Sequence, residues 1–305
     1  MYKCNKILIH ILGFLSENGD MINELVAMHC YPSENVLQLL TYCLNPPSLV
    51  FPYMDNGTLD DKLRDTWEPL TWGNRAKIAL GSARGLRHLH GNEIVHGDIK
   101  SNNILLDKHF EPKIGDFGTI ALLYNDQRNE VTHKSMAAIT GTRHYLPADY
   151  LEGTFKRQVR KPVDIYCFGI VLFEMMTGRR PSDEIGSVQR TTMRTFVDNL
   201  HNESLSADEV PNDYVADVDR DGICFQITTT NGVCEVRWPY FFYQMGLLCT
   251  KKGYKDRPKV EAVHEEIKNV YLCYSVPPQE QHEQRSRADK ILKSEIMSGI
   301  VMNIS

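Results

Sequence analysis

The fold is decided by HGDIKSNNILLD, residues 96–107, and by KIGDFG, residues 113–118. Asp98 is followed by Asn103 five positions later, and Asp116 comes thirteen positions after that. The short apolar runs between the motifs, separated by turn-prone residues, indicate two strands of a hairpin. Two aspartates and an asparagine on loops that flank such a hairpin can converge on one metal and phosphate site.

Taken one at a time, these polar residues also fit solvated turns, in which Asp, Asn and Gly are common. Together, at this spacing, they resemble the protein kinase family, whose catalytic loop reads HRDxxxxN and whose metal loop reads DFG. The resemblance implies that Asp98 accepts the proton of the substrate hydroxyl, that Asn103 and Asp116 bind Mg²⁺, and that Lys100 contacts the γ-phosphate of ATP. A lysine two positions after the aspartate is the pattern of the serine/threonine kinases.

Further kinase landmarks follow in the family's order. GTRHYLPADY, residues 141–150, resembles the end of an activation segment, with Asp149 where the family has a glutamate. The resemblance implies an ion pair between Asp149 and Arg257, although the shorter aspartate has less reach. Asp164 matches a buried helix aspartate that holds the backbone of the catalytic loop. The alternative for Asp164 is a helix N-cap.

The stretch FPYMDNG, residues 51–57, resembles the hinge against which kinases bind adenine. The resemblance places Phe51 behind the base, Pro52 and Met54 at its edge, and Leu105 beneath its ring. Proline has no N–H but keeps its carbonyl, so adenine can donate to Pro52 O and accept from Met54 N–H. The same four residues also fit ordinary core packing.

The upstream part of the kinase pattern is incomplete. Glu24 fits the helix glutamate that kinases pair with a strand lysine, and Lys6 lies 18 positions before it. Lys6 is therefore the candidate phosphate lysine, although the same stretch also fits a strand similar to ENVLQLL, residues 34–40. Gly13 and Gly19 are the only glycines before Glu24, so no GxGxxG precedes it. We therefore expect a chain that begins near the third strand of a kinase upper lobe and binds Mg-ATP weakly.

Within the kinases, the sequence is most similar to the Pelle and interleukin-receptor-associated kinases of Toll signalling. The similar segments are YMDNGTLDDKL, HGDIKSNNILLD, GTRHYLP and DIYCFGIVLFEMMTGRRPSDE. The resemblance implies a protein substrate with Ser or Thr, a place in innate immune signalling, and possible Toll-pathway adaptors. The death domain that tethers such kinases to adaptors has no counterpart in this sequence.

Composition excludes several other classes of partner. The 305 residues are 42% hydrophobic and carry a net charge of -5, which argues for a globular core and against nucleic acid. Eight cysteines without a CxxC pair indicate reduced thiols in a cytosolic protein. No apolar run reaches the ~18 residues of a membrane-spanning helix. We therefore expect a cytoplasmic protein with no nucleic-acid partner and no membrane span.

We expect an α+β, bilobal kinase-like fold. Residues 1–54 are expected to form a truncated β-rich N-lobe, residues 55–275 a mostly helical C-lobe, and residues 276–305 a charged tail. Hydrophobic periodicity predicts the helices and strands. The expected helices are 21–28, 59–63, 72–89, 163–176, 240–249 and 259–271, and the expected strands are 36–42, 48–53, 104–106 and 113–114.

Two functions from different classes follow from this pattern. The first is a protein Ser/Thr kinase that uses ATP and Mg²⁺, and the set Asp98, Asn103 and Asp116 favours it because a scaffold needs none of the three. The second is a catalytically impaired, truncated kinase or a pseudokinase scaffold. The missing glycine loop favours this second function.

Overall fold

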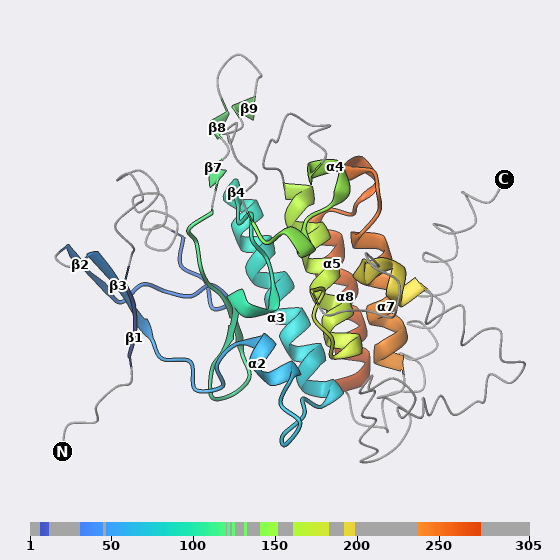
Figure 1. Ribbon diagram of the computed structural model, residues 1–305, viewed down its shortest axis with the longest axis horizontal. Coiled ribbons are helices and arrows are strands. Elements are labelled where there is room, and N and C mark those ends of the chain that lie inside the picture. The colour runs from blue at the N-terminus through green and yellow to red at the C-terminus, as the bar shows by residue number, and fades with distance from the viewer. Residues whose placement is uncertain are drawn as a thin grey trace, which may run out of the picture.

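The computed structural model describes residues 7–11, 31–44, 47–119, 121–122, 124–125, 131–132, 141–151, 161–182, 192–198 and 237–275. Within these ranges, a small antiparallel sheet lies at one side of a larger, mostly helical body (Figure 1). This helix-rich architecture with few strands is consistent with the expected kinase-like fold. None of the helices in these ranges is long and apolar enough to cross a bilayer.

The sheet contains β1 (Ile7–Ile11), β3 (Pro47–Pro52) and β2 (Thr41–Leu44), in the order β1-β3-β2. Both pairings are antiparallel, and the central β3 supplies the buried face through Leu49 and Phe51, which are 0% and 3% exposed. Side chains two positions apart point to the same face of a strand, which explains this pair. The strand expected at 48–53 is therefore present, one residue earlier.

The strand expected at 36–42 begins only at Thr41. Val36 and Leu37 instead lie beside β6 (Pro112–Ile114), where Leu37 N donates to Ile114 O at 2.8 Å. The physical reason is that an apolar segment can bury itself against the helical body as well as in a sheet. Gly85 allows this approach, because a Cβ there would lie 2.5 Å from Asn35 O.

The helical body follows the expected helices closely. Its elements are α2 (Leu59–Leu63), α3 (Trp72–Gly91), α4 (Ala148–Leu151), α5 (Lys161–Thr177), α7 (Arg237–Cys249) and α8 (Val260–Ser275). Thr58 and Thr71 cap α2 and α3 by accepting hydrogen bonds from backbone N–H groups of the first turn. The central α5 packs against α7, and α3 packs against α8. The apolar run of α5 is buried on all sides for this reason.

Short elements connect the helices around the polar motifs. β5 (Ile104–Leu106) pairs with β6, and β4 (Ile94–Val95) pairs with β7 (Ala121–Leu122). β8 (Tyr124–Asn125) pairs with β9 (Val131–Thr132). Three 3₁₀ turns complete the set: η1 (Ser101–Asn103), η2 (Arg143–Tyr145) and η3 (Tyr254–Asp256).

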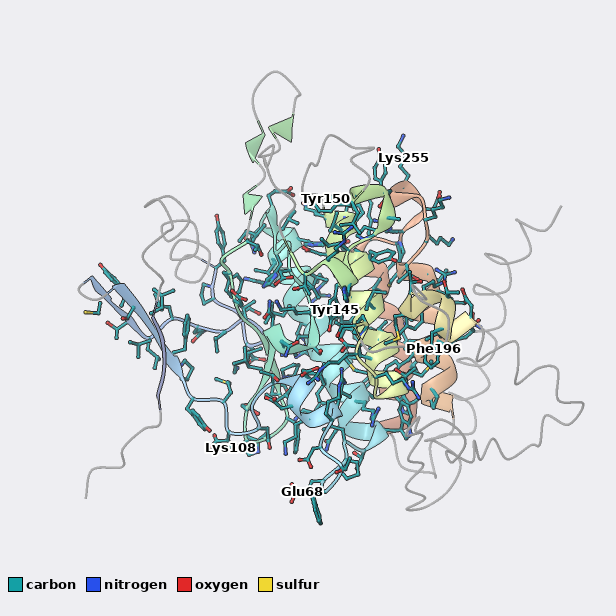
Figure 2. The ribbon with its side chains drawn as sticks, viewed as in Figure 1. Glu68, Lys108, Tyr145, Tyr150, Phe196 and Lys255 are labelled. Atoms are coloured by element: carbon teal, nitrogen blue, oxygen red, sulfur yellow. The ribbon has the colours of Figure 1, made fainter. Side chains whose placement is uncertain are left out.

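Residues 193–198 form a short helix where the sequence analysis predicted none, and Met193 and Val197, one turn apart, are buried in the core. The helix expected at 21–28 and the tail at 276–305 lie outside the described residues. Tyr145 lies inside the helical body, whereas Glu68 lies at its periphery (Figure 2).

Candidate active site

Asp98 lies between β4 and η1 and is 7% exposed. Its Oδ1 accepts from Thr142 N at 2.6 Å, and its Oδ2 accepts from Lys100 Nζ at 2.6 Å. Burial would raise the pKa of Asp98, but the hydrogen bonds from Lys100 and Thr142 outweigh it and hold the pKa below its usual range. The carboxylate is therefore ionised at neutral pH and can accept a proton.

Lys100 joins the Asp98 loop to the segment around Thr142. Its Nζ also donates to Thr142 Oγ1 at 2.9 Å, so the ammonium is held between a carboxylate and a hydroxyl. Gly141 makes this contact possible, because its φ is +94° and a Cβ there would lie 2.5 Å from Gly97 O. A residue with a side chain would push the two segments apart.

Asn103 and Asp116 lie on neighbouring loops. Gly115 N donates to Asn103 O at 2.9 Å, which fixes the start of the second loop beside the first. Asn103 Nδ2 donates to Asp98 O at 2.9 Å, so the amide oxygen is the atom left for other ligands. Asp116 is exposed, with φ 59°, and its carboxylate makes no hydrogen bond or ion pair with the described residues. Oxygen donors of these two types fit the ligand preference of Mg²⁺.

His96 and Phe117 connect the loop of Asp98 with the loop of Asp116. Their ring centroids are 5.3 Å apart, and Phe117 is 0% exposed. His96 Nε2 donates to Gly115 O at 2.9 Å, while His96 Nδ1 accepts from Asp98 N at 3.2 Å. One imidazole therefore fixes the backbone of both loops.

Asp164 on α5 holds the backbone at His96, as the sequence predicted. Its carboxylate is 0% exposed and accepts from His96 N at 2.9 Å, Gly97 N at 2.8 Å and His90 Nε2 at 2.9 Å. The alternative of an N-cap is wrong, because α5 begins at Lys161, three positions earlier.

The predicted ion pair between Asp149 and Arg257 is confirmed. Arg257 Nη2 lies 3.0 Å from Asp149 Oδ1 and 2.9 Å from Oδ2. The guanidinium also donates to Pro162 O and to Lys251 O, and the Arg257 side chain is 1% exposed. The shorter aspartate therefore reaches its partner, which ties α4 to the segment before α8.

The predicted hinge segment, residues 51–57, runs beside β5. Asn56 N donates to Leu106 O at 3.1 Å, and Leu106 N donates to Gly57 O at 2.9 Å. Leu105 is half-buried, Met54 is 6% exposed, and Pro52 ends β3. Phe51 packs in the core, which agrees both with a position behind the adenine base and with ordinary core packing. The two remaining candidate residues, Lys6 and Glu24, lie outside the described residues.

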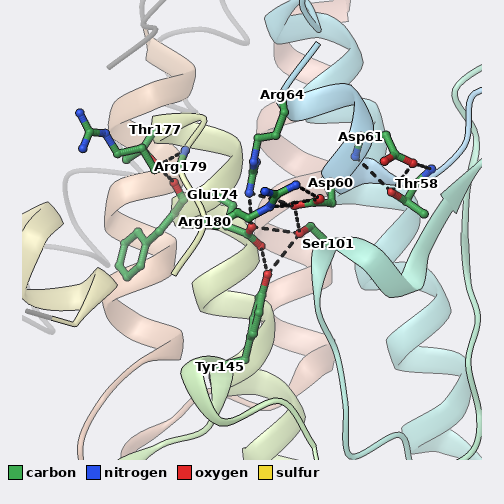
Figure 3. Close-up of polar contacts among 11 residues, drawn as sticks. Thr58, Asp60, Asp61, Arg64, Ser101, Tyr145, Glu174, Thr177, Arg179 and Arg180 are labelled. Carbon is green, nitrogen blue, oxygen red and sulfur yellow. Dashed lines mark hydrogen bonds and ion pairs between the residues drawn. The ribbon is translucent and has the colours of Figure 1, made fainter. Parts of the chain in front are cut away.

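Figure 3 shows a buried polar cluster beside the Asp98 loop, which the sequence analysis did not predict. Glu174 on α5 accepts from Ser101, Tyr145 and Arg64. Arg64 also pairs with Asp60, and so does Arg180. The available signal was a glutamate in the apolar run VLFEMM, since a charge in a fully buried helix needs partners.

Glu174 should make stability depend on pH. Burial raises its pKa to about 7, against the opposing effect of Arg64. The folded state then binds more protons than the unfolded state between about pH 4.3, the usual glutamate pKa, and pH 7, so the stabilisation declines as pH rises through that window. Glu174→Gln removes this dependence, which amounts to about 4 kcal/mol.

Urea unfolding at pH 4.5 and pH 8 measures this effect. The wild type is expected to lose stability relative to Glu174→Gln as pH rises. Glu68→Gln is the control, because the Glu68 side chain is 84% exposed. Parallel pH dependences for wild type and Glu174→Gln would show that Glu174 does not titrate in this range.

Comparisons with known proteins agree with this geometry. The Pelle-like serine/threonine-protein kinase pik-1 of Caenorhabditis elegans is 41% identical over 186 residues, which are 56% of this chain and 38% of that protein. The probable serine/threonine-protein kinase PBL21 of Arabidopsis thaliana is 38% identical over 177 residues, 55% of this chain and 45% of that protein. Protein BRASSINOSTEROID INSENSITIVE 1 of Arabidopsis thaliana is 37% identical over 186 residues, 58% of this chain and 15% of that protein.

The chain thus spans less than half the length of each of these relatives. Residues 5–267 match the family described as protein tyrosine and serine/threonine kinase. This match covers most of the chain, including both motifs around Asp98 and Asp116. The chain therefore belongs to the protein kinase family.

Proposed function

We propose that the chain is a protein Ser/Thr kinase that transfers the γ-phosphoryl group of ATP to a Ser or Thr hydroxyl of a protein. The observation that carries the proposal is the ionised Asp98 carboxylate, held at 2.6 Å by both Lys100 Nζ and Thr142 N beside the loop of Asn103. A fixed carboxylate next to oxygen ligands and an ammonium is what phosphoryl transfer requires, because its catalysis is mainly positioning and charge stabilisation.

Each candidate residue has one role in this proposal. Asp98 accepts the substrate proton, and Lys100 contacts the γ-phosphate. Asn103 and Asp116 would hold Mg²⁺, which neutralises charge on the phosphates when bound. Lys6 and Glu24 are proposed as the phosphate lysine and its partner.

The proposed adenine site uses the segment beside β5. Adenine would donate to Pro52 O, accept from Met54 N–H and rest on Leu105. The hydrogen bonds between the hinge and Leu106 support this assignment, because they hold Met54 and Leu105 on adjacent segments.

Domain division and cellular setting are also proposals. We propose a partial N-lobe at residues 1–54, a C-lobe at 55–275 and a tail at 276–305, which gives the bilobal layout. We also propose a cytoplasmic role in Toll or interleukin-receptor-type innate immune signalling, and the 41% identity to a Pelle-like serine/threonine-protein kinase supports the Pelle part of this proposal. Plant receptor kinases are 30% to 42% identical, so identity alone does not separate the two groups.

Calorimetric titration with ATP tests the proposed metal site. Magnesium is expected to strengthen ATP binding to the wild type but not to Asp116→Asn, because the substitution removes an anionic oxygen ligand. Asp107→Asn is the matched control, since the Asp107 side chain accepts from His109 N and Glu111 N in the β5–β6 turn, and Asn56 Nδ2 bonds the Asp107 backbone carbonyl, which the substitution keeps. The dissociation constant of Mg-ATP from the same titration tests the expectation that the chain binds Mg-ATP weakly.

Phosphate transfer from ATP labelled at the γ position completes the experiment. Transfer to a Ser/Thr protein substrate supports the proposal. ATP binding that is equal with and without magnesium would contradict the metal site. Magnesium-dependent binding without any transfer would instead support a pseudokinase scaffold.

A further inference from the structure

The turn η2 presents an exposed arginine next to the proposed base. Thr142 N donates to Asp98 Oδ1 at 2.6 Å, and Thr142 directly precedes η2. Arg143 and His144 at the start of η2 are exposed, whereas Tyr145 is buried. The hydrogen bond to Asp98, one N–Cα bond and one Cα–Cα step place the Arg143 Cα within about 8 Å of Asp98 Oδ1.

The Arg143 guanidinium makes no hydrogen bond or ion pair with the described residues. By contrast, Arg64, Arg180 and Arg257 each pair with a carboxylate. A guanidinium is always charged in proteins, and its planar fork of donors matches a carboxylate. Arg143 is therefore a cation that a bound anionic group can reach.

The local balance of charge also favours an anionic partner. The two segments that meet at Asp98, residues 96–103 and 141–147, contain one aspartate, one lysine and one arginine. Lys100 Nζ lies 2.6 Å from Asp98 Oδ2, so these two charges compensate each other. With neutral histidines, Arg143 leaves the two segments with a net positive charge. An acidic side chain beside them is attracted, and a basic side chain is repelled.

A protein substrate brings its own side chains into the range of Arg143. Its Ser or Thr hydroxyl must lie at Asp98 for the carboxylate to accept the proton. An extended peptide advances about 3.3 to 3.6 Å per residue, so side chains up to about three positions from the phosphoacceptor lie close enough to meet Arg143. The charge of these neighbouring residues therefore affects how the substrate binds.

We propose that Arg143 determines substrate specificity by binding an Asp or Glu within about three positions of the phosphoacceptor. The inference rests on the proposed function, because it requires the substrate hydroxyl at Asp98. It assigns a class of substrate, namely Ser/Thr segments with an acidic rather than a basic neighbour. Arg143 itself takes no part in proton or phosphoryl transfer.

Phosphorylation of matched peptides tests this inference. The peptides contain one Ser and differ only in carrying Glu, Gln or Lys next to it. The wild type is expected to show a kcat/KM about five- to tenfold higher for the Glu peptide than for the Gln peptide. The difference should lie mainly in the peptide KM, because the contact forms in the ground state as well as in the transition state.

Variants of Arg143 assign the preference to this side chain. Arg143→Gln should abolish the difference between the Glu and Gln peptides, and Arg143→Glu should make the Lys peptide the best of the three. Raising the ionic strength from about 0.05 M to about 0.5 M should weaken the wild-type preference, because exposed charges are screened by salt.

Lys108→Gln is the matched control, because Lys108 is an exposed cation in the β5–β6 turn. Figure 2 shows it apart from Tyr145, the last residue of η2. Its peptide preference should equal that of the wild type, and its melting temperature and those of the Arg143 variants should be unchanged. Equal kcat/KM for the Glu and Lys peptides in the wild type, or an unchanged preference in Arg143→Glu, would overturn the inference and leave the proposed function standing.

Binding of the same peptides with Ala in place of Ser separates the inference from the proposed function. Fluorescence anisotropy measures this binding without any transfer. Binding of the Glu peptide that depends on Arg143, in a chain that phosphorylates none of the Ser peptides, would overturn the proposed function and support the acidic preference. The absence of both transfer and Arg143-dependent binding would overturn both.

Discussion

Asp98→Asn is expected to lower the rate of phosphoryl transfer by about 10²- to 10⁴-fold, the range for loss of a general base. Asparagine has the size of aspartate, but its one oxygen can accept from only one of Thr142 N and Lys100 Nζ, because these donors bond different oxygens of Asp98. The fold should survive the loss of one hydrogen bond, while the proton acceptor is lost. Single-turnover transfer at saturating Mg-ATP measures the effect separately from binding.

Asp107→Asn is again the matched control, because it changes an aspartate of the same hairpin whose carboxylate accepts hydrogen bonds from its own turn. Its rate should equal that of the wild type. A wild-type rate for Asp98→Asn would show that another group accepts the proton. It would leave membership of the kinase family untouched, because that rests on the match over residues 5–267.

Arg257→Ala is expected to lower the free energy of unfolding by about 3 to 5 kcal/mol, since it leaves a partly buried carboxylate unpaired. The Asp149 side chain is 13% exposed, and Arg257 also satisfies carbonyls at Pro162, Lys251 and Lys252. Arg257→Lys should recover only part of the loss, because an ammonium cannot reproduce the fork of a guanidinium. Chemical denaturation measures both variants.

The exposed pair Lys268 and Glu265 provides the comparison for Arg257. Their side chains are 41% and 52% exposed, so Lys268→Ala should change stability by less than about 1 kcal/mol. A double-mutant cycle with Asp149→Asn isolates the pairwise energy at Arg257. Equal losses at Arg257 and Lys268 would show that the bond to Asp149 contributes no more than a surface ion pair.

Much of the helical body could be predicted from the sequence. The run from Val163 to Met176 predicted a helix buried on all sides, because no face of it is polar enough to meet water. The hairpin of Ile104–Leu106 was predicted from short apolar runs around turn residues. The 36–42 strand was misplaced, since apolar content does not show which strand a segment will lie against, and Val36 and Leu37 lie beside β6.

The site residues were predicted from motif spacing and from resemblance to the kinases rather than from hydrophobic periodicity. The spacing of Asp98, Asn103 and Asp116 indicated a shared site, because loops at the ends of a short hairpin lie close together. The pair of Asp149 and Arg257 came from resemblance to the kinases, since nothing in their separation of 108 positions implies contact.

The sequence by itself therefore determined the helices and the residues beside the short hairpin, because local periodicity and turn chemistry act over a few neighbouring positions. Only the tertiary structure decided how Arg64, Ser101, Tyr145 and Glu174 meet. These residues lie up to 110 positions apart, and a local pattern carries no information on which distant donors a buried carboxylate will find. Burial in α5 forces Glu174 to find partners, and the packing of α2, η1 and η2 around that helix selects them.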